Sequence, residues 1–338
     1  MRIVLVGFGV VAQSFAELVD IESKMLAAKY GLKPKIVGIV DSKGSAVSSD
    51  GVVLRKALAL KRETKSMEGL GPEIYDPRMK AIDAIEGVDC EVVVEATPTN
   101  LQNGEPGLSH VRAAMKNGRH VICVNKGPLA FAMPALIELA HHNEIIFKFS
   151  GTVGGGTPVL DFAKRCLEGS SISSISGILN GTSNFILSKM ASEGTEMRDA
   201  LAEAQKLGYA EADPTYDIGG HDTACKLVII SNHVLGAGLT INDVKITGIT
   251  EVTKEDVERA KRNGKTVKLI GRMDGVARVS PEEIPLSHPL NVSGTFNAVS
   301  FNTDPSGEIT LVGKGAGGKE TASAVLRDLI EVRRSFSR

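Results

Sequence analysis

Short apolar runs alternate with helical patterns along the amino-terminal part of the chain. The runs are rich in valine and isoleucine, as expected of strands buried on both faces of a parallel sheet. They occupy residues 3–6, 35–40, 91–95, 120–124 and 145–149. Segments with apolar residues at helical spacing lie between them, at residues 13–19, 52–64 and 110–117. This alternation predicts a Rossmann-type, doubly wound parallel sheet.

The pattern changes after residue 150, where strands and helices no longer alternate regularly. Helices are expected at 159–166, 196–207 and 323–330, and strands at 173–179, 299–302 and 308–312. The last helix has the spacing of one that packs back on the first sheet. The chain is therefore α/β, with a first domain of residues 1–130 and 313–338. Residues 131–312 are expected to form a second, mixed-sheet α/β domain.

Charge and composition exclude several classes of function. The 338 residues include 39 lysines and arginines against 40 acidic residues, for a net charge of −1. This balance indicates neither nucleic-acid binding nor attraction to an anionic membrane. Apolar runs are too short to span a bilayer, and strand residues begin at once, without a signal peptide. The four cysteines show no C-x-x-C spacing, so free thiols in a reducing cytoplasm are expected.

A glycine fingerprint directly follows the first apolar run. It reads Gly7-Phe-Gly9-Val10-Val11-Ala12 and opens a helical pattern. In this motif the first glycine makes a tight turn, the second admits a pyrophosphate, and the third position packs helix against strand. The free N–H groups at the helix start favour an anion. The strand–turn–helix context therefore predicts a dinucleotide site that includes Val10 and Val11.

Three further residues lie at strand ends, where such sheets bind ligands. Asp41 ends the second apolar run and would bond the ribose hydroxyls of NAD. Ser42, Lys43 and Ser45 follow it and would instead hold a 2′-phosphate, so the choice between NAD and NADP stays open. The other two residues are Thr97, a plausible cofactor contact, and Lys126, a cation in the same crevice.

The run from Gly151 to Thr157 contains three consecutive glycines before an apolar helix. Such a run offers backbone carbonyls or amides as ligands. A monovalent cation, the nicotinamide end of a cofactor and a flexible hinge are the three interpretations that the residues allow.

Carboxylates gather in the loop 207–226, which is punctuated by proline and glycine. Asp222 and Lys226 are four residues apart, so a helix that starts near His221 places them on one face. Glu211 and its neighbours would grip an ammonium group while Lys226 moves a proton. A solvated loop with a surface ion pair worth less than about 1 kcal/mol is the alternative.

Several long segments resemble the homoserine dehydrogenase family. The central ones are Asn180-Gly-Thr-Ser-Asn-Phe-Ile-Leu, Ala200-Leu-Ala-Glu-Ala-Gln-Lys-Leu-Gly-Tyr-Ala-Glu-Ala-Asp-Pro-Thr and Asp217-Ile-Gly-Gly-His-Asp-Thr-Ala-Cys-Lys-Leu. Supporting segments are residues 7–9, 124–127, 151–157 and 313–318. The matches run in family order from residue 3 to about residue 330. The resemblance implies NAD(P)-linked, reversible reduction of aspartate 4-semialdehyde to L-homoserine, toward threonine and methionine.

The resemblance also implies roles for individual residues. Lys226 falls on the proton-donor lysine and Lys126 on a lysine between cofactor and substrate. Glu211 and Asp222 fall on amino-acid-binding positions. Gly208 and Gly315 fall on cofactor contacts. The sodium site of the family falls on the backbone carbonyls of Ser150, Val153, Gly155 and Thr157. A homodimer is implied as well.

The chain departs from the family in a few places. Ser150 stands where many members have glutamate, which a main-chain ligand tolerates. The resemblance is to the short monofunctional form, without a regulatory domain or a fused kinase. Feedback regulation and the physiological direction are left open.

Two rival functions differ in their chemistry. An aspartate-semialdehyde dehydrogenase-like enzyme needs a nucleophilic cysteine, for which Cys225 is the candidate near polar groups. A cofactor-sensing regulator without turnover would not need the set Glu211, Asp222 and Lys226.

Overall fold

The computed structural model describes residues 1–336 and has two compact units. Among the described residues, the first unit joins residues 1–152 to residues 317–336, and the second comprises residues 153–316. Residues 131–152 thus lie in the first unit, and residues 313–316 in the second, whereas the sequence placed the boundaries at 130 and 313. The reason for the first difference is that the first sheet has a further strand at Phe147–Lys148, which the chain reaches through a long helix after residue 125.

The first unit is built on a seven-stranded sheet of order β4-β3-β2-β1-β5-β6-β7. Its strands are β1 (Arg2–Val6), β2 (Lys35–Asp41), β3 (Gly44–Val47), β4 (Tyr75–Asp76), β5 (Val92–Glu95), β6 (His120–Cys123) and β7 (Phe147–Lys148). The five strands from β2 to β7 across the sheet are parallel, whereas β3 pairs antiparallel with β2 and β4. The predicted parallel sheet is confirmed, with an antiparallel edge that the polar stretch 43–80 did not reveal.

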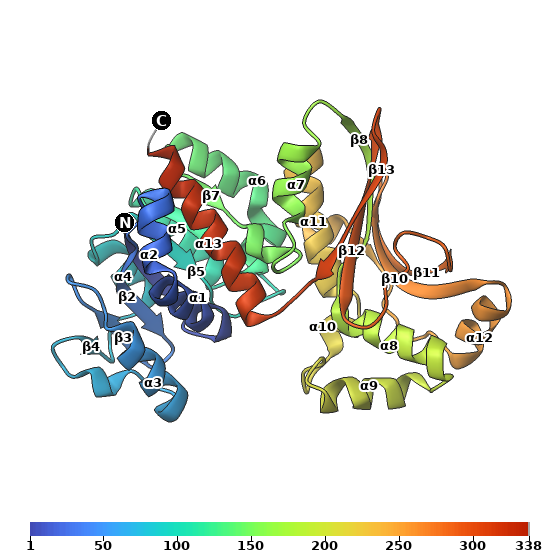
Figure 1. Ribbon diagram of the computed structural model, residues 1–338, viewed down its shortest axis with the longest axis horizontal. Helices are drawn as coiled ribbons and strands as arrows, with labels where there is room; N and C mark the ends of the chain where they lie inside the picture. Colours follow the sequence, from blue (N-terminus) through green and yellow to red (C-terminus); the bar gives the residue numbers. More distant parts are fainter. Residues whose placement is uncertain (337–338) are drawn as a thin grey trace. The chain divides into compact units, whose positions relative to one another are not determined.

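Helices cover this sheet (Figure 1). They are α1 (Val10–Ile21), α2 (Ser23–Tyr30), α3 (Leu54–Thr64), α4 (Ala81–Gly87), α5 (Gly107–Lys116), α6 (Lys126–His142) and α13 (Gly318–Ser335), with short 3-10 helices at Glu68–Leu70 and Ser150–Thr152. The carboxy-terminal helix α13 lies beside α1. Its apolar side, including Val325, Leu329 and Val332, is fully buried in the core of this unit. The expectation that the last helix returns to the first sheet is confirmed.

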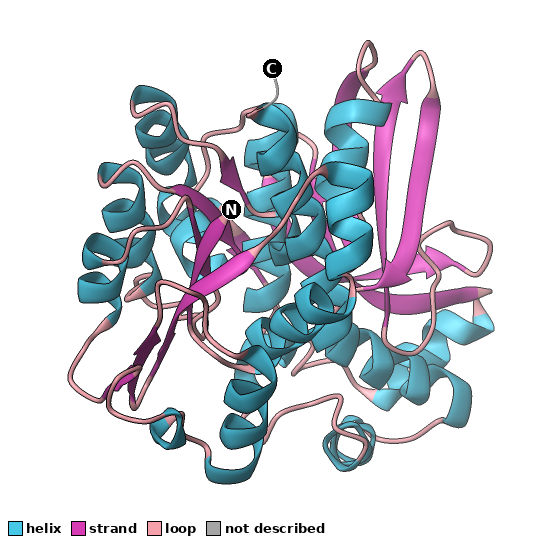
Figure 2. Cartoon of the chain, turned by 60° about the vertical axis from the view of Figure 1, so that its left-hand side comes forward, coloured by secondary structure: helices cyan, strands magenta, loops and turns pink. Residues whose placement is uncertain are grey.

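The second unit contains a six-stranded mixed sheet of order β13-β12-β8-β10-β11-β9. Its strands are β8 (Ser171–Ile178), β9 (Lys245–Ile246), β10 (Lys265–Met273), β11 (Ala277–Pro285), β12 (Phe296–Asp304) and β13 (Gly307–Lys314). The pairing is antiparallel except between β9 and β11. Its longer strands are prominent magenta arrows in Figure 2.

The second unit also contains helices. They are α7 (Val159–Cys166), α8 (Gly181–Glu193), α9 (Met197–Lys206), α10 (Thr215–Ile218), α11 (His221–Leu235) and α12 (Lys254–Arg262), with a 3-10 helix at Ile241–Asp243. Helices α8 and α11 both contact β8 or its neighbour β10. Within residues 1–336, no helix is both long enough and apolar enough to cross a bilayer.

Candidate active site

The turn after β1 brings the glycine fingerprint close to the end of β5. Gly7 has a φ of +91°, which favours glycine. A Cβ at Gly7 would lie 2.6 Å from the carbonyl oxygen of Ala96, so the backbones of the two strand ends meet there without room for a side chain. Gly7 is therefore required by the fold of the turn itself.

Gly9 lies in a different environment, at the N-cap of α1. Apart from its chain neighbours, no protein atom lies within 4 Å of the place that a Cβ would occupy. No side chain caps the first turn, and Val10 there is 72% exposed. Ala12 is buried against the core, as the third fingerprint position requires. Open space beside uncapped N–H groups suits a pyrophosphate.

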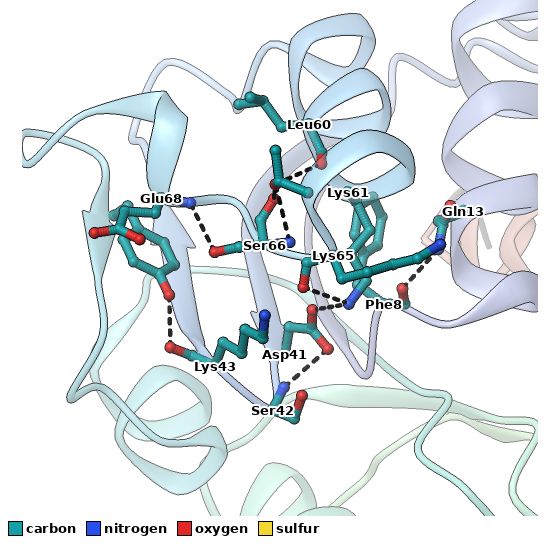
Figure 3. A network of polar contacts seen from close by, with 12 residues as sticks. Phe8, Gln13, Asp41, Ser42, Lys43, Leu60, Lys61, Lys65, Ser66 and Glu68 are labelled. Carbon is teal, nitrogen blue, oxygen red and sulfur yellow. Dashed lines mark hydrogen bonds and ion pairs between the residues drawn. The ribbon is translucent and has the colours of Figure 1, made fainter.

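Asp41 ends β2 and already has protein partners (Figure 3). Its Oδ1 accepts a hydrogen bond of 2.8 Å from the backbone N–H of Ser42. Its Oδ2 is paired with the ammonium group of Lys61, which reaches across from α3. Asp41, the predicted ribose ligand, is therefore paired with a cation that the sequence did not reveal. Lys43 donates no bond here, and its carbonyl accepts the hydroxyl of Tyr75 at 2.5 Å.

Thr97 and Lys126 follow the ends of two neighbouring strands, β5 and β6. The backbone N–H of Thr97 donates to Glu95 at 3.0 Å. Lys126 is the first residue of α6 and is partly buried. Asn125 precedes it as the N-cap, whose side chain accepts from the N–H of Gly127 at 2.9 Å. Both residues thus belong to the carboxyl edge of the sheet, where ligands of such sheets bind.

In the second unit, Lys226 is a buried lysine in α11, with 6% of its surface exposed. Its ammonium group is 2.8 Å from Oδ2 of Asp222, one helical turn earlier, and donates to the carbonyl of Leu179 at 2.6 Å. The expectation that Asp222 and Lys226 share a helix face is confirmed. A buried ammonium held by one carboxylate and one carbonyl is oriented in a defined direction, as a proton donor requires.

Asn180 connects this pair to a second carboxylate. Its side-chain amide donates to Asp217 at 2.7 Å and to Asp222 at 2.9 Å. Its oxygen accepts from the N–H of Ser183 at 2.8 Å, so Asn180 also caps α8. Burial, and next the nearby Asp222 carboxylate, raise the pKa of Asp217 above its ordinary value. Two carboxylates close to one lysine form a site suited to an additional cation, such as a substrate ammonium group.

Other predicted residues lie around this cluster or apart from it. Glu211 is exposed on the loop after α9, and its carbonyl accepts from Gln205 at 3.2 Å. Gly208 has a φ of +76° and follows the end of α9, a conformation and a position at which glycine commonly ends a helix. Asp213 accepts the N–H of Thr215 at 3.1 Å and supports the loop. Gly315 lies against Asn297, because a Cβ there would be 1.9 Å from the amide nitrogen of that side chain.

The residues expected at a sodium site lie in the glycine-rich segment and just before it. Ser150 is buried, and its N–H and hydroxyl donate to Asp328 of α13 at 3.0 and 2.6 Å. Gly155 has a φ of +55°, and Thr157 donates its N–H to Gly154 at 2.8 Å. Val153 is buried. Among residues 1–336, no group of three or more His, Cys, Asp and Glu side chains is placed to hold a metal. Sodium on backbone carbonyls stays a prediction.

The sequence did not reveal several groups that contact Lys226, Asp222 or Asp41. In the sequence, Asn180 stands out only as the first residue of a family segment, and asparagine there is typical of a helix N-cap. Leu179 contributes a carbonyl, which no side-chain pattern reveals. Lys61 lies 20 residues from Asp41 in a charge-rich helix, where a lysine is normally solvated. Only its pairing with the partly buried Asp41 distinguishes it.

Comparisons with known proteins agree with these features. The family model described as homoserine dehydrogenase matches residues 158–330. A homoserine dehydrogenase from Methanocaldococcus jannaschii is 45% identical, and the match covers 98% of each chain. An NAD(+)-dependent homoserine dehydrogenase from Pseudomonas canavaninivorans is 40% identical over 100% of this chain and 97% of its own.

A solved structure extends the likeness to three dimensions. It is a mutant of a hyperthermophilic archaeal homoserine dehydrogenase in complex with NADPH. It superposes with a TM-score of 0.86 at 28% identity, covering 99% of this chain and 98% of that one. The family model spans half of the chain, and the relatives match over nearly their whole length. The chain belongs to the homoserine dehydrogenase family.

Proposed function

We propose that this protein catalyses the reversible, NAD(P)H-dependent reduction of L-aspartate 4-semialdehyde to L-homoserine. The observation that carries the proposal is the buried Lys226–Asp222 pair with Asn180 and Asp217 around it. Bound nicotinamide supplies or accepts the hydride. The protein must then deliver a proton to the aldehyde oxygen and hold the amino-acid end of the substrate.

Lys226 is the proton donor in this proposal. As the aldehyde carbon receives hydride, negative charge develops on its oxygen, and an ammonium group both stabilises that charge and protonates it. Asp222 and the Leu179 carbonyl keep the ammonium group in place, at 2.8 and 2.6 Å. In the reverse direction, neutral Lys226 takes the hydroxyl proton of homoserine. Glu211 and Asp222 are proposed to hold the substrate ammonium group, with Lys126 as the further lysine that the family places between cofactor and substrate.

The cofactor is proposed to bind the first unit at Gly7, Gly9, Val10, Val11, Asp41 and Thr97, with Gly208 and Gly315 contributed by the second. The open space at Gly9 and the uncapped start of α1 support this placement. Asp41 favours the ribose of NAD, while Lys61 beside it offers a cation to a 2′-phosphate. One relative is named as NAD(+)-dependent and one solved relative holds NADPH, so we propose that both cofactors are accepted.

Three further features are proposed from the family and remain to be measured. They are sodium on the carbonyls of Ser150, Val153, Gly155 and Thr157, a homodimer, and a cytoplasmic location. The sodium site is tested by comparing the enzyme's activity in sodium buffer with its activity in potassium buffer, because chelators do not remove sodium efficiently.

The rival that requires a cysteine nucleophile is poorly supported by three of the four thiols, which are buried, whereas Cys166 is exposed. Cys225 is fully buried in α11. Burial raises the pKa of Cys90 to about 11 and that of Cys123 well above its ordinary value. A reactive thiolate needs a lowered pKa and access to substrate. Phosphate-dependent NADPH formation from aspartate semialdehyde is therefore not expected.

The test is a steady-state assay of the full chain with L-homoserine and either NAD⁺ or NADP⁺. Homoserine-dependent formation of reduced cofactor is expected with both, and omission of inorganic phosphate should not change the rate. A protein that binds cofactor but shows no homoserine-dependent turnover would contradict the proposal and favour the cofactor-sensing regulator.

A further inference from the structure

A buried carboxylate outside the proposed catalytic set lies at the carboxyl end of β5. Glu95 has no exposed surface. Oε2 is 2.9 Å from Nδ1 of His110 on α5, which is itself almost fully buried. Oε1 accepts from the N–H and the hydroxyl of Thr97, and from the amide of Asn125 at 3.3 Å. Both carboxylate oxygens are thus occupied by donors.

These donors belong to two segments that carry proposed site residues. Thr97 opens the loop after β5, and Asn125 is the N-cap directly before Lys126. The amide of Asn125 also donates to the Thr97 hydroxyl at 3.1 Å and to the carbonyl of Pro98 at 3.4 Å. Glu95 therefore connects the loop after β5 to the start of α6 through one network. In the sheet, Glu95 lies directly between Val6 of β1 and Cys123 of β6.

Close backbone approaches hold the same segments together. A Cβ on Gly7 would lie 2.8 Å from the nitrogen of Thr97, and one on Gly107 would lie 2.5 Å from the amide nitrogen of Asn125. A Cβ on Gly127 would lie 2.9 Å from the carbonyl oxygen of Asn100. The loop after β5 thus closely approaches the fingerprint turn at Gly7 and the first turn of α6 at Gly127, so a shift of this loop affects both neighbours.

Stability alone is a weak explanation for such a buried charge. Apolar residues of similar volume often serve stability as well as or better than a buried ion pair. A carboxylate that accepts hydrogen bonds from several elements fixes the positions of those donors relative to one another, which an apolar residue does not do. Here the donors flank the cofactor turn and Lys126.

We propose that Glu95, supported by His110, is a positioning residue that sets the cofactor loop at Thr97 and the start of α6 at Lys126 relative to each other. This inference rests on the proposed function, because it assigns the two segments to cofactor and substrate chemistry. Misplacement of a reacting group by about 1 Å costs on the order of a hundredfold in rate. The effect of losing Glu95 should therefore fall on turnover and cofactor binding as well as on stability.

The decisive variants keep the shape of the side chain and change its hydrogen bonds. Glu95→Gln retains the volume but loses the charge and one accepting oxygen. Thr97→Val replaces the hydroxyl by a methyl group, whereas Thr97→Ser keeps the hydroxyl and loses the methyl group. Glu91→Gln, at the opposite, exposed end of the same strand segment, is the matched control, because the Glu91 carboxylate accepts from the N–H of Arg2 and lies near the amino terminus.

The measurements are the Kd of NADH from its own fluorescence, and kcat and KM with homoserine, all well below each variant's Tm. For Glu95→Gln we expect kcat to fall between about tenfold and a hundredfold and the Kd of NADH to rise severalfold. Thr97→Val should show a smaller effect of the same kind, Thr97→Ser should approach wild type, and Glu91→Gln should equal it. The double variant Glu95→Gln/Thr97→Val should lose less than the product of the single losses, because both changes affect one network.

Two results would overturn the inference. One is a Glu95→Gln enzyme with a lowered Tm but wild-type kcat, KM and NADH affinity, since this describes a purely structural residue. The other is full additivity of the two changes. If the wild-type protein binds NADH but does not oxidise homoserine, the proposed function fails, and the Kd of NADH in Glu95→Gln then tests the positioning role by itself.

Discussion

Lys226 is a buried lysine whose ammonium group is paired with a carboxylate. It is 94% buried by surface, since only 6% is exposed, and it keeps a carboxylate within 2.8 Å. Lysines are seldom buried without a partner, and this one shares its partner with Asn180. The lysine therefore has a defined direction at a site with two carboxylates, which a surface ion pair would not have.

The first prediction concerns the loss of this group. Lys226→Ala should lower kcat by about 10² to 10⁴, the usual contribution of a positioned acid or base. The Kd of NADH should stay within about twofold, because the cofactor turn belongs to the other unit. Steady-state kinetics and NADH fluorescence measure the two effects. Lys245→Ala, an exposed lysine on β9, is the control. Near-normal turnover of Lys226→Ala would remove this residue from the chemistry.

Lys268 on β10 is a second buried lysine, with different surroundings. Its ammonium group donates to Asn184 at 2.8 Å, to Ser188 at 2.9 Å and to the carbonyl of Val292 at 2.7 Å. All three acceptors are neutral, so nothing offsets the loss of hydration except these bonds. Burial consequently lowers the pKa of Lys268 to about 8.

The second prediction is a pH dependence of stability caused by Lys268. Its pKa is lower in the folded protein than the ordinary 10.5, so between pH 8 and 10.5 the unfolded chain binds more protons. The free energy of unfolding should therefore rise with pH across this window, by at most about 3 kcal/mol from this group. Urea unfolding of wild type and Lys268→Met at pH 8 and pH 10 isolates the contribution. Parallel pH curves for the two proteins would contradict it.

At the scale of elements, the turn between β1 and α1 assigns different tasks to its two glycines. Gly7 is required by the protein, because a Cβ would clash with the backbone at Ala96. Gly9 is not required by the protein, because the space at its Cβ is open and its φ of −80° suits any residue. Under the proposed function, Gly9 is instead required by the cofactor pyrophosphate that would occupy that space.

The third prediction compares alanine at these two positions. Gly9→Ala should fold with a Tm close to that of wild type, yet its Kd for NADH should rise at least about tenfold, because a methyl group enters the pyrophosphate space. Gly7→Ala should be destabilised by more than about 1 kcal/mol from strain at positive φ and the clash with Ala96. Differential scanning fluorimetry and NADH fluorescence measure both properties. Unchanged NADH affinity in Gly9→Ala would place the pyrophosphate elsewhere.

Local signals predicted some elements well. Helix α7 begins and ends as expected, at Val159 and Cys166, because its apolar spacing is strong and proline precedes it. The strands β3 and β4 were missed, since their four and two residues lie within a polar stretch. Helix α6 was missed as well, because Pro134 inside it reads as an interruption.

At the scale of the whole molecule, the first unit is discontinuous in sequence. Its core contains both the amino-terminal strands and α13, which follows more than 160 residues of the second unit. Leu329 and Val332 of α13 are fully buried in it. Completion of the cofactor-binding unit therefore depends on the last segment of the chain.

The fourth prediction follows from this return of the chain. Leu329→Ala should lower the free energy of unfolding by about 2 to 5 kcal/mol, the usual loss for a buried leucine. The loss should appear in the unit that binds cofactor, so NADH should protect the variant against urea. Circular dichroism and NADH fluorescence along a urea series measure this. Val276→Ala, in an exposed turn of the second unit, should change stability by less than about 0.5 kcal/mol. An unaltered midpoint for Leu329→Ala would contradict the dependence.

The sequence by itself determined what depends on neighbours along the chain. The fingerprint at Gly7 and Gly9, the facing of Asp222 and Lys226, and the helix end at Gly208 are local patterns, because strand, turn and helix periodicity need only a few consecutive residues. Family membership also followed from consecutive segments.

Only the tertiary structure decided which distant groups share one environment. Asn180 contacts carboxylates 37 and 42 residues later, and Lys61 pairs with Asp41 20 residues earlier. The network around Glu95 gathers donors from the loop after β5, from α5 and from the N-cap of α6. These contacts depend on strand order and helix packing. Both bring together segments that are distant in the chain, and no local sequence pattern shows that these segments will meet. Burial then turns ordinary polar side chains into strong interactions, because water no longer competes for them.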